Sequence, residues 1–411
     1  MCSAASPLAE AGLPTSIPDP GSPDPGSTDT RDTQDGTRAK SVSGVTMDPV
    51  DLPIVPPLQP MLAKAASGVP VQPVGEPVWS YEPKWDGFRA IVFRDGDAVV
   101  FGSRGGKDLA RYFPEMVDAV RAELPPRCVV DGELVVPREI GGRTRLDWGA
   151  LSERIHPADS RVRLLSKESP AHFVGFDLLA LDDEDLTSLP FSDRRTALLG
   201  AVGGGALAGG VRCHVTAATR DAATAKRWFE TFEGAGLDGV VAKRLDGHYR
   251  PNKREMVKVK HSRTADVVAI GYRPHKSQPG IGSILLGLYD GDELRMVGGA
   301  SAFTAKRRVE LLAELEPLRV GDDVVAEGEA TRWRSSADRS WIPLRPLRVL
   351  EVAYDQMEGE LGEVGSRVGV RFRHAARFLR WRPDRSPESC TFEQLEVPLR
   401  YDLADVLARE R

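Results

Sequence analysis

Apolar and β-branched residues between positions 77 and 262 form short runs that turn residues separate. These runs predict strands at 77–82, 88–94, 97–102, 128–136, 172–181, 237–243 and 255–260. Longer amphipathic patterns predict helices at 109–123, 146–155, 192–201 and 221–233. Because helices do not alternate regularly with strands, the pattern favours an α+β fold over a doubly wound sheet.

The pattern changes after residue 263. Short strands are predicted at 265–272, 283–289, 294–300, 347–354 and 368–373, with one helix at 304–316. The turn Asp290-Gly291-Asp292 predicts a hairpin between two of these strands. Strands and a helix in this order fit an OB-fold, a small β-barrel that binds nucleic acid.

The first 47 residues have a different composition. They are rich in Pro, Ser, Thr, Asp and Gly and contain few large apolar residues, so they cannot bury enough surface to offset the entropy of ordering. We predict a disordered tail at 1–47, with a mis-assigned start codon as the alternative, and domains at 48–262 and 263–411. The glycine-rich run 202–210 lacks the lysine and serine of a phosphate-binding loop and is interpreted as a linker.

Charge and cysteine content limit the possible classes of protein. The net charge of −5 over 411 residues does not indicate nucleic-acid binding, although a net charge can hide a local excess of positive charge. The four cysteines are far apart, which argues against a zinc ribbon and a disulfide framework and favours a reducing cytoplasm. No apolar run approaches the roughly 20 residues that span a bilayer.

Lys84 is the first candidate for chemistry. It lies in Lys84-Trp85-Asp86-Gly87-Phe88-Arg89, between two predicted strands. A lysine attacks only as the neutral amine, which nearby positive charge and desolvation favour, and Arg89 is a cation in the same turn. Taken alone, the motif also fits a surface lysine in a hairpin.

Further blocks follow Lys84 along the chain. They are Ser103-Arg104-Gly105-Gly106, Val130-Asp131-Gly132-Glu133-Leu134-Val135, His172-Phe173-Val174-Gly175-Phe176-Asp177-Leu178-Leu179, Asp238-Gly239-Val240-Val241-Ala242-Lys243 and Val257-Lys258-Val259-Lys260. With Lys84, they resemble the motifs of the covalent nucleotidyltransferases, in the order of that family. This superfamily contains ATP-dependent DNA ligases, RNA ligases and mRNA capping enzymes. The resemblance covers nearly everything after residue 50.

The resemblance implies that Lys84 attacks the α-phosphate of ATP and expels pyrophosphate. Lys258 and Lys260 alternate along a strand and therefore share one face. The resemblance implies that they contact the α-phosphate, whereas the pair alone also fits a solvated strand face. Arg89 and Arg104 would bind ribose and phosphate. Arg254 is matched to a family arginine, although the loop is shorter here and Lys253 is the alternative.

Other roles also follow from the resemblance. Glu133 would hold the ribose hydroxyls or the metal shell, and Asp238 would face a catalytic Mg²⁺ or Mn²⁺. The family commonly has Glu at this last position, so an ordinary turn aspartate is the alternative. Glu82 would help to read adenine, and Phe176 would stack on the base, although a Phe in an apolar strand usually belongs to the core.

Arginines gather near the C-terminus. The stretch Arg377-Phe378-Leu379-Arg380-Trp381-Arg382-Pro383-Asp384-Arg385 resembles the OB-domain motif that engages the β- and γ-phosphates of ATP. The guanidinium fork suits phosphate geometry. Arg380 and Arg382 are therefore candidates for orienting pyrophosphate, with DNA-backbone contact as the alternative.

As a whole, the sequence resembles bacterial stand-alone ATP-dependent DNA ligases of the ligase C type. The resemblance implies an ATP-grasp-like nucleotidyltransferase domain followed by an OB-fold, which acts on nicked double-stranded DNA with ATP and Mg²⁺ or Mn²⁺. We expect a monomer, associated with the nucleoid in the cytoplasm, that serves DNA repair. The alternatives are an RNA ligase or capping-type enzyme, and a non-catalytic nucleic-acid-binding module.

Overall fold

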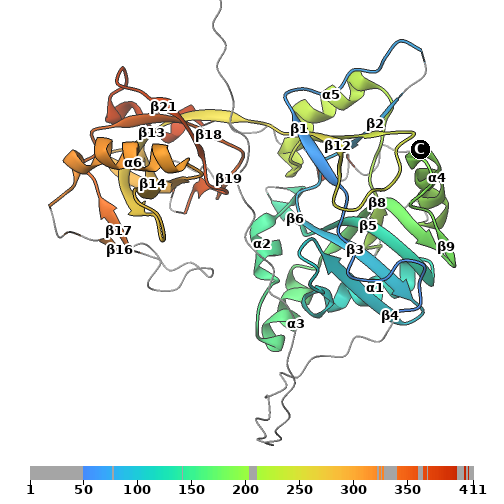
Figure 1. The fold of residues 1–411 in the computed structure, drawn as a ribbon. Coiled ribbons are helices and arrows are strands. Elements are labelled where there is room, and N and C mark those ends of the chain that lie inside the picture. Colours follow the sequence, from blue (N-terminus) through green and yellow to red (C-terminus); the bar gives the residue numbers. More distant parts are fainter. Residues whose placement is uncertain are drawn as a thin grey trace, which may run out of the picture. The chain divides into compact units, whose positions relative to one another are not determined.

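The computed structural model describes residues 50–395, except 76–77, 141, 203–210, 322–323, 325, 328–339, 360–363 and 368, together with residues 402, 403 and 406. The predicted tail and residues 203–210 of the predicted linker lie outside this part of the chain. The described elements form an α+β fold, as predicted (Figure 1). Among them, no helix combines the length and the apolar character that a membrane crossing needs.

A six-stranded sheet forms the first layer. Its order is β10 (Cys213–Val215), β8 (His172–Leu181), β5 (Arg127–Val135), β3 (Phe88–Asp95) and β4 (Ala98–Ser103), with β9 (Glu184–Asp185) paired to β8. Side chains alternate across β3: Ala90 and Val92 enter one apolar core, whereas Ile91 and Phe93 enter another. The first of these cores packs against α1 (Pro114–Glu123), so this sheet is buried on both faces.

A four-stranded sheet forms the second layer. Its order is β1 (Leu62–Ala66), β12 (Arg254–Val259), β11 (Val240–Arg244) and β2 (Trp79–Pro83). Met256 of β12 packs in the same core as Ile91 and Phe93 of the first sheet. On this sheet lies α5 (Ala222–Thr231), within the predicted helix 221–233. Its Trp228 is buried in the core, and the Asp221 side chain caps its N-terminus.

The sequence prediction missed several elements of this region. They are β1, the hairpin β6 (Pro137–Ile140) and β7 (Arg143–Leu146), α3 (Asp159–Glu168) and β10. The β1 strand reads Leu-Ala-Lys-Ala-Ala, and these residues have little strand propensity of their own. The strand forms because its backbone pairs in parallel with β12. The α3 helix buries only Val162 and Leu165, which is too weak a stripe to recognise. The predicted helices 146–155 and 192–201 are found as α2 (Trp148–Glu153) and α4 (Phe191–Ala201).

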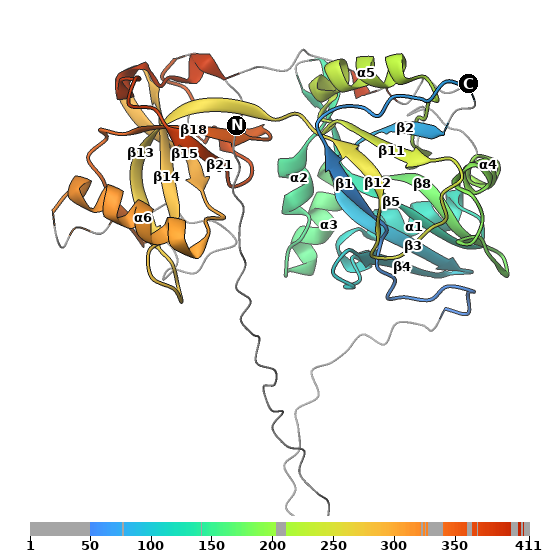
Figure 2. The same ribbon diagram turned by 45° about the horizontal axis from the view of Figure 1, so that its top comes forward.

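The C-terminal region contains a second sheet system (Figure 2). The predicted strands and helix are found as β13 (Arg263–Pro274), β14 (Ile281–Asp290), β15 (Glu293–Ala300), α6 (Ala305–Leu315) and β18 (Val349–Tyr354). The sheet order is β15-β14-β13-β17-β16, where β16 is Ala326–Glu327 and β17 is Ser340–Pro343. Off this path, β18 pairs with β13 and with β21 (Arg377–Trp381).

One strand of this region was placed wrongly. The predicted strand 368–373 is reduced to β20 (Arg371–Phe372), which pairs only with β19 (Met357–Glu358). The longer strand is β21, which we had interpreted only as a phosphate-binding motif. Its arginines interrupt the apolar alternation, so the sequence signal for a strand is weak there.

Gly239 fixes the junction between β2 and β11. Its carbonyl accepts a hydrogen bond from the Lys84 N–H at 2.8 Å, and the Asp238 N–H donates to the Lys84 carbonyl at 2.9 Å. Gly239 has φ +130°, and a Cβ atom there would lie 2.0 Å from the Val259 carbonyl oxygen. Only glycine satisfies both the backbone angle and the close approach.

We therefore expect Gly239→Ala to lower the free energy of unfolding by at least about 2 kcal/mol, because backbone cannot move aside as a side chain can. Chemical denaturation followed by circular dichroism measures the loss. The matched control is Gly68→Ala, where no atom lies within 4 Å of the added Cβ. Equal stability of the two variants would show that the β2–β11 junction tolerates a side chain.

Candidate active site

Strand pairing brings three of the predicted motifs to one end of the four-stranded sheet. β11 pairs antiparallel with β2, which sets Val240 opposite Pro83, the residue before Lys84. β11 also pairs antiparallel with β12, which sets Val241 opposite Lys258. The central strand therefore carries the Asp238 loop between the lysine of the first motif and the lysines of the last.

The side chains at this end form a charged cluster. The Lys84 Nζ lies 2.6 Å from the Asp238 Oδ2, and the Lys260 Nζ lies 2.7 Å from the same oxygen. Burial alone would raise the pKa of Asp238, but the two ammonium groups outweigh burial and hold this pKa below its ordinary value. Burial, and then the positive charges of Lys260 and Lys84, lower the pKa of Lys258. Lys84, Asp238, Lys258 and Lys260 thus meet in one site.

Arg89 has a partner that the sequence did not predict. Its Nε and Nη2 donate to the two carboxylate oxygens of Asp131, each at 2.6 Å. Asp131 is fully buried on β5, and this two-point pair neutralises it. The charge of Arg89 is therefore largely compensated.

Glu133 lies two residues after Asp131, directly opposite Arg89 in the β3–β5 register. Burial raises the pKa of Glu133 to about 7, although the charges of Arg89 and Lys84 and a bond from the Gly87 N–H work in the opposite direction. A Cβ atom on Gly87 would lie 2.1 Å from the Leu134 carbonyl oxygen, so glycine lets the first motif pack on β5. The positive charges of Arg89 and Lys84 therefore do not fully compensate the cost of burying the Glu133 carboxylate.

Glu82 is buried on β2, two residues before Lys84. Its Oε2 lies 2.8 Å from the Lys243 Nζ, while its Oε1 is buried with no hydrogen-bond partner among the described residues. The Lys243 ammonium also donates to the Phe176 carbonyl at 2.8 Å. The Phe176 ring is buried, with the Lys243 Nζ 4.7 Å and the Arg89 guanidinium carbon 4.4 Å from its centroid. Lys243 therefore links Glu82 to Phe176.

The remaining predicted residues of this region are more exposed. Arg104 lies in the turn after β4, and its charge contributes to the lowered pKa of Lys258. Arg254 begins β12, is exposed, and donates to the Ala63 carbonyl at 3.2 Å. Lys253 is exposed as well. The structure brings Arg104 near the lysine cluster, whereas the contact of Arg254 is with the β1 backbone.

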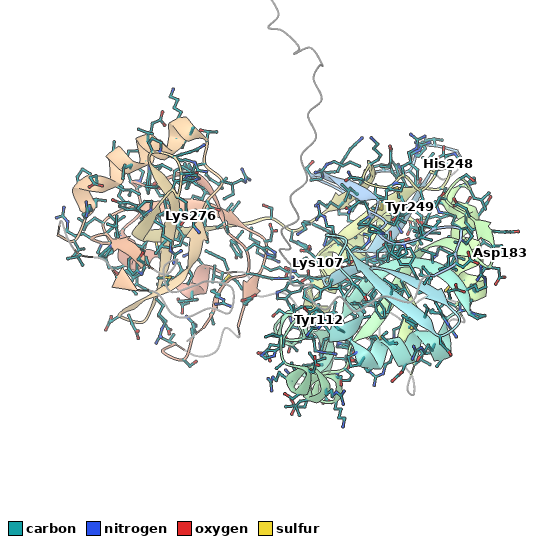
Figure 3. All side chains as sticks on the ribbon, turned by 60° about the horizontal axis from the view of Figure 1, so that its bottom comes forward. Lys107, Tyr112, Asp183, His248, Tyr249 and Lys276 are labelled. Atoms are coloured by element: carbon teal, nitrogen blue, oxygen red, sulfur yellow. The ribbon has the colours of Figure 1, made fainter. Side chains whose placement is uncertain are left out.

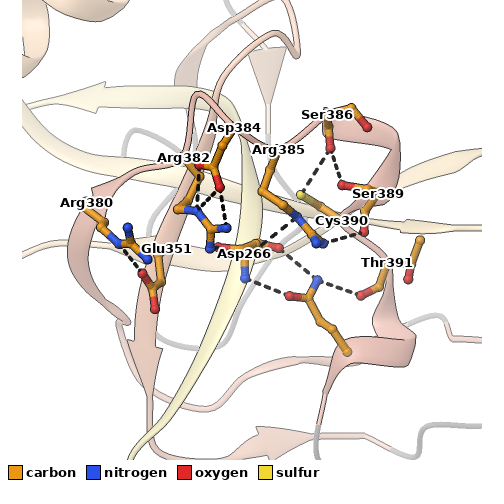
Figure 4. A network of polar contacts seen from close by, with 11 residues as sticks. Asp266, Glu351, Arg380, Arg382, Asp384, Arg385, Ser386, Ser389, Cys390 and Thr391 are labelled. Carbon is orange, nitrogen blue, oxygen red and sulfur yellow. Dashed lines mark hydrogen bonds and ion pairs between the residues drawn. The ribbon is translucent and has the colours of Figure 1, made fainter.

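The C-terminal arginines form a separate polar network (Figure 4). Arg380 is exposed and its Nε donates to the Glu351 carboxylate at 2.6 Å. Arg382 donates to both oxygens of Asp266 at 2.9 Å and also to Asp384. The hydrogen bond from Arg382 lowers the pKa of Asp384 to about 2. The partner of Asp384 is thus Arg382, two residues earlier in the chain.

Comparison with known proteins identifies the family. Residues 60–260 match the ATP dependent DNA ligase domain, and residues 277–385 match the ATP dependent DNA ligase C terminal region. DNA ligase C1 of Mycolicibacterium smegmatis is 63% identical over 362 residues, which cover 88% of this chain and 100% of that protein. This chain belongs to the ATP-dependent DNA ligases.

Two further similarities are consistent with this family. DNA ligase C of Mycobacterium tuberculosis is 51% identical over 87% of this chain and 99% of that protein. The solved structure named Pmar-Lig_PreS3 has a TM-score of 0.50 at 17% identity, covers 74% of this chain and 63% of that one, and is similar in fold alone. The recognition as a ligase of the C type is thus confirmed by sequence.

The carboxylates of this ligase suit a divalent metal that binds together with ATP. The described residues contain no group of three His, Cys, Asp or Glu side chains that could hold an ion. Mg²⁺ usually takes only one or two carboxylates and completes its shell with phosphate oxygens and water. Glu133 and Asp238 offer carboxylate oxygens, both interact electrostatically with Lys84, and the two side chains fit this requirement.

Three residues that contact the predicted site residues were not predicted from the sequence. Asp131 stood within a quoted motif, but no partner for it was predicted. Lys243 ends the Asp238 motif, and a lysine in an apolar strand was a signal that it pairs with a buried acid. Tyr249 lies in the loop between β11 and β12, outside every motif, and carried no signal at all.

The raised pKa of Glu133 makes stability depend on pH. Between the ordinary value of 4.5 and about 7, the folded protein binds a proton that the unfolded chain has released. Stability therefore falls as the pH rises through this window, and the penalty persists above it. Glu133→Gln should remove the penalty, so we expect its melting temperature to exceed that of the wild type by a few degrees at pH 8, and much less at pH 5.

Scanning calorimetry of the protein without ATP, across pH 5 to 8, measures this difference. The exposed Glu139→Gln on β6 is the control, and its difference from the wild type should not change with pH. A Glu133→Gln difference that is the same at both pH values would contradict the assignment of an uncompensated carboxylate.

Proposed function

We propose that this ATP-dependent DNA ligase seals nicks in double-stranded DNA through a lysyl-AMP intermediate on Lys84. One observation carries the proposal: the β2–β11–β12 register gathers Lys84, Lys258 and Lys260 around one carboxylate at the end of one sheet. An amine nucleophile and further cations in one place suit attack on a phosphate, where negative charge spreads in the transition state.

The first step joins AMP to the enzyme. The Lys84 amine attacks the α-phosphate of ATP, the new bond joins Nζ to phosphorus, and the bond to pyrophosphate breaks. In the structure the ammonium is held by Asp238, so Lys84 must leave this ion pair and lose its proton before it attacks. Lys258 and Lys260 then balance the charge of the α-phosphate. Glu82 and Phe176 bind adenine, and Arg89, Arg104 and Arg254 bind the sugar and phosphates.

The later steps use the same pocket. AMP passes from Lys84 to the 5′-phosphate at the nick, and the 3′-hydroxyl attacks that phosphate and releases AMP. Glu133 and Asp238 would hold Mg²⁺ or Mn²⁺, which neutralises phosphate charge when it is bound. The similarity to ligases of the C type supports a role in DNA repair.

Several broader features belong to the same proposal. We infer a nucleotidyltransferase domain at 48–262 and an OB-fold domain at 263–411, because β13 begins at Arg263 and the C-terminal sheet follows it. We also infer a monomer in the cytoplasm, close to the nucleoid. The described cysteines, Cys128, Cys213 and Cys390, are buried and free, which suits a reducing compartment.

Lys84→Ala should abolish the AMP adduct, because no other side chain supplies this bond. Mass spectrometry of the intact protein after incubation with ATP and Mg²⁺ should show one added AMP on the wild type and none on the variant. Lys64→Ala, on β1 at the opposite edge of the same sheet, is the control and should keep the adduct. An adduct on the Lys84 variant would contradict the assignment of the nucleophile.

A second prediction separates two roles of the C-terminal arginines. If Arg380 and Arg382 orient pyrophosphate, removing both should slow adenylylation of Lys84 at least about tenfold, equivalent to about 1.4 kcal/mol, and spare sealing of a nick that already carries AMP. Single-turnover rates of the two steps in Arg380→Ala/Arg382→Ala measure this.

The matched control is Arg371→Ala. Arg371 and Arg380 are both exposed, at 54% and 64%, and each pairs with one glutamate. We expect this control to leave both steps unchanged. If the double variant instead seals only the pre-adenylylated nick more slowly, the slope of log K for DNA binding against log salt concentration should also fall in magnitude by about 0.9 per lost contact. That result would assign these arginines to the DNA backbone.

A further inference from the structure

Tyr249 connects three segments that lie far apart in the sequence. It belongs to the loop between β11 and β12, within the N-terminal region (Figure 3), and only 4% of it is exposed. Its hydroxyl lies 2.7 Å from the Asp131 Oδ2 on β5 and 3.1 Å from the backbone nitrogen of Met61, before β1. No motif of the family resemblance contains Tyr249.

The chemistry of these contacts fixes the direction of each hydrogen bond. A backbone N–H can only donate, so the Tyr249 oxygen accepts from Met61. The hydroxyl proton is then given to Asp131, whose carboxylate accepts it. Burial and the negative charge of Asp131 both raise the pKa of Tyr249, so the phenol remains the donor.

The same carboxylate holds Arg89. Its two oxygens accept from the Nε and Nη2 of Arg89, each at 2.6 Å, and the Oδ2 also accepts from Tyr249. These bonds fix the plane of the carboxylate, and the plane of the guanidinium follows from it. Two of the five N–H groups of Arg89 are used in this way, so the side chain can still donate to a ligand.

Arg89 is the partly exposed end of this series of hydrogen bonds. The Arg89 side chain is 22% exposed, whereas the Asp131 side chain is fully buried. Its guanidinium carbon lies 4.4 Å from the centroid of the Phe176 ring, and its charge contributes to the pKa of Glu133. The orientation of Arg89 thus determines which donors face the space between these two residues.

We propose that Tyr249 is a positioning residue for nucleotide binding, which fixes the Asp131 carboxylate and through it the guanidinium of Arg89. This inference rests on the proposed function, because it requires that Arg89 contacts ATP. Tyr249 itself does not touch the substrate. A shift of about 1 Å in a binding group is enough to weaken catalysis strongly, so one hydroxyl can matter at this distance.

Tyr249→Phe tests this role, because it removes only the hydroxyl. The rate of Lys84 adenylylation is measured against ATP concentration, which separates KM from kcat. We expect KM for ATP to rise about fivefold to tenfold, and kcat to change less than about twofold, because Lys84 and its lysine neighbours are untouched.

Tyr272→Phe is the matched control. Tyr272 is 2% exposed and its hydroxyl also donates to a carboxylate, that of Glu316, at 2.8 Å, but it lies on β13 in the C-terminal region. Both variants lose a hydrogen bond from a buried tyrosine to a carboxylate, and Tyr249→Phe also loses the one from the Met61 N–H, so both should lose stability. Only Tyr249→Phe should raise KM for ATP.

A double variant decides whether Tyr249 acts through Arg89. If it does, Tyr249→Phe should change kcat/KM less than twofold when Arg89 is already Ala, because the group that it positions is gone. Multiplicative effects of the two substitutions, or an unchanged KM in Tyr249→Phe, would overturn the proposal. Failure of the proposed function looks different, because the wild type would then form no AMP adduct.

Discussion

The ion cluster of Lys84, Asp238 and Lys260 is the contact on which the arrangement of this site depends. One carboxylate oxygen lies within 2.7 Å of both ammonium groups. The three residues come from the ends of three adjacent strands, so the cluster exists only if β2, β11 and β12 keep their register. A slip of one residue would turn every side chain of a strand to the other face.

Backbone contacts impose that register. Two backbone hydrogen bonds, from the Lys84 N–H to the Gly239 carbonyl and from the Asp238 N–H to the Lys84 carbonyl, hold the Lys84 motif against the Asp238 motif. They need no side chain. The positive φ of Gly239 and its contact with Val259 then hold the same loop against β12. Glycines that seem to serve only flexibility in the sequence therefore set the distances between charged groups.

The buried acids near the ion cluster share a second feature. Asp131 pairs with Arg89, Glu82 with Lys243, and Asp177 with Arg194. A buried carboxylate without a partner would cost several kcal/mol, so each acid on these central strands is held by a cation from another strand or helix. Glu133 is the exception among these acids, because burial outweighs the charges of Arg89 and Lys84 and raises its pKa.

The sequence was sufficient for the strands with strong apolar runs and for the order of the motifs. It could not give the pairing of charges, because Arg89 and Asp131 are 42 residues apart and nothing local relates them. The strand β1 and the helix α3 were missed because tertiary contacts, rather than their own propensities, hold them.

The charges of the site explain why the nucleophile is paired. Lys84, Lys258 and Lys260 carry like charges that repel one another, and Asp238 offsets that repulsion. The α-phosphate of ATP offers oxygen ligands of the same type, and like the carboxylate it carries one negative charge. Under the proposed function it can therefore pair with Lys260. Lys84 must still lose its proton and leave Asp238 before it attacks.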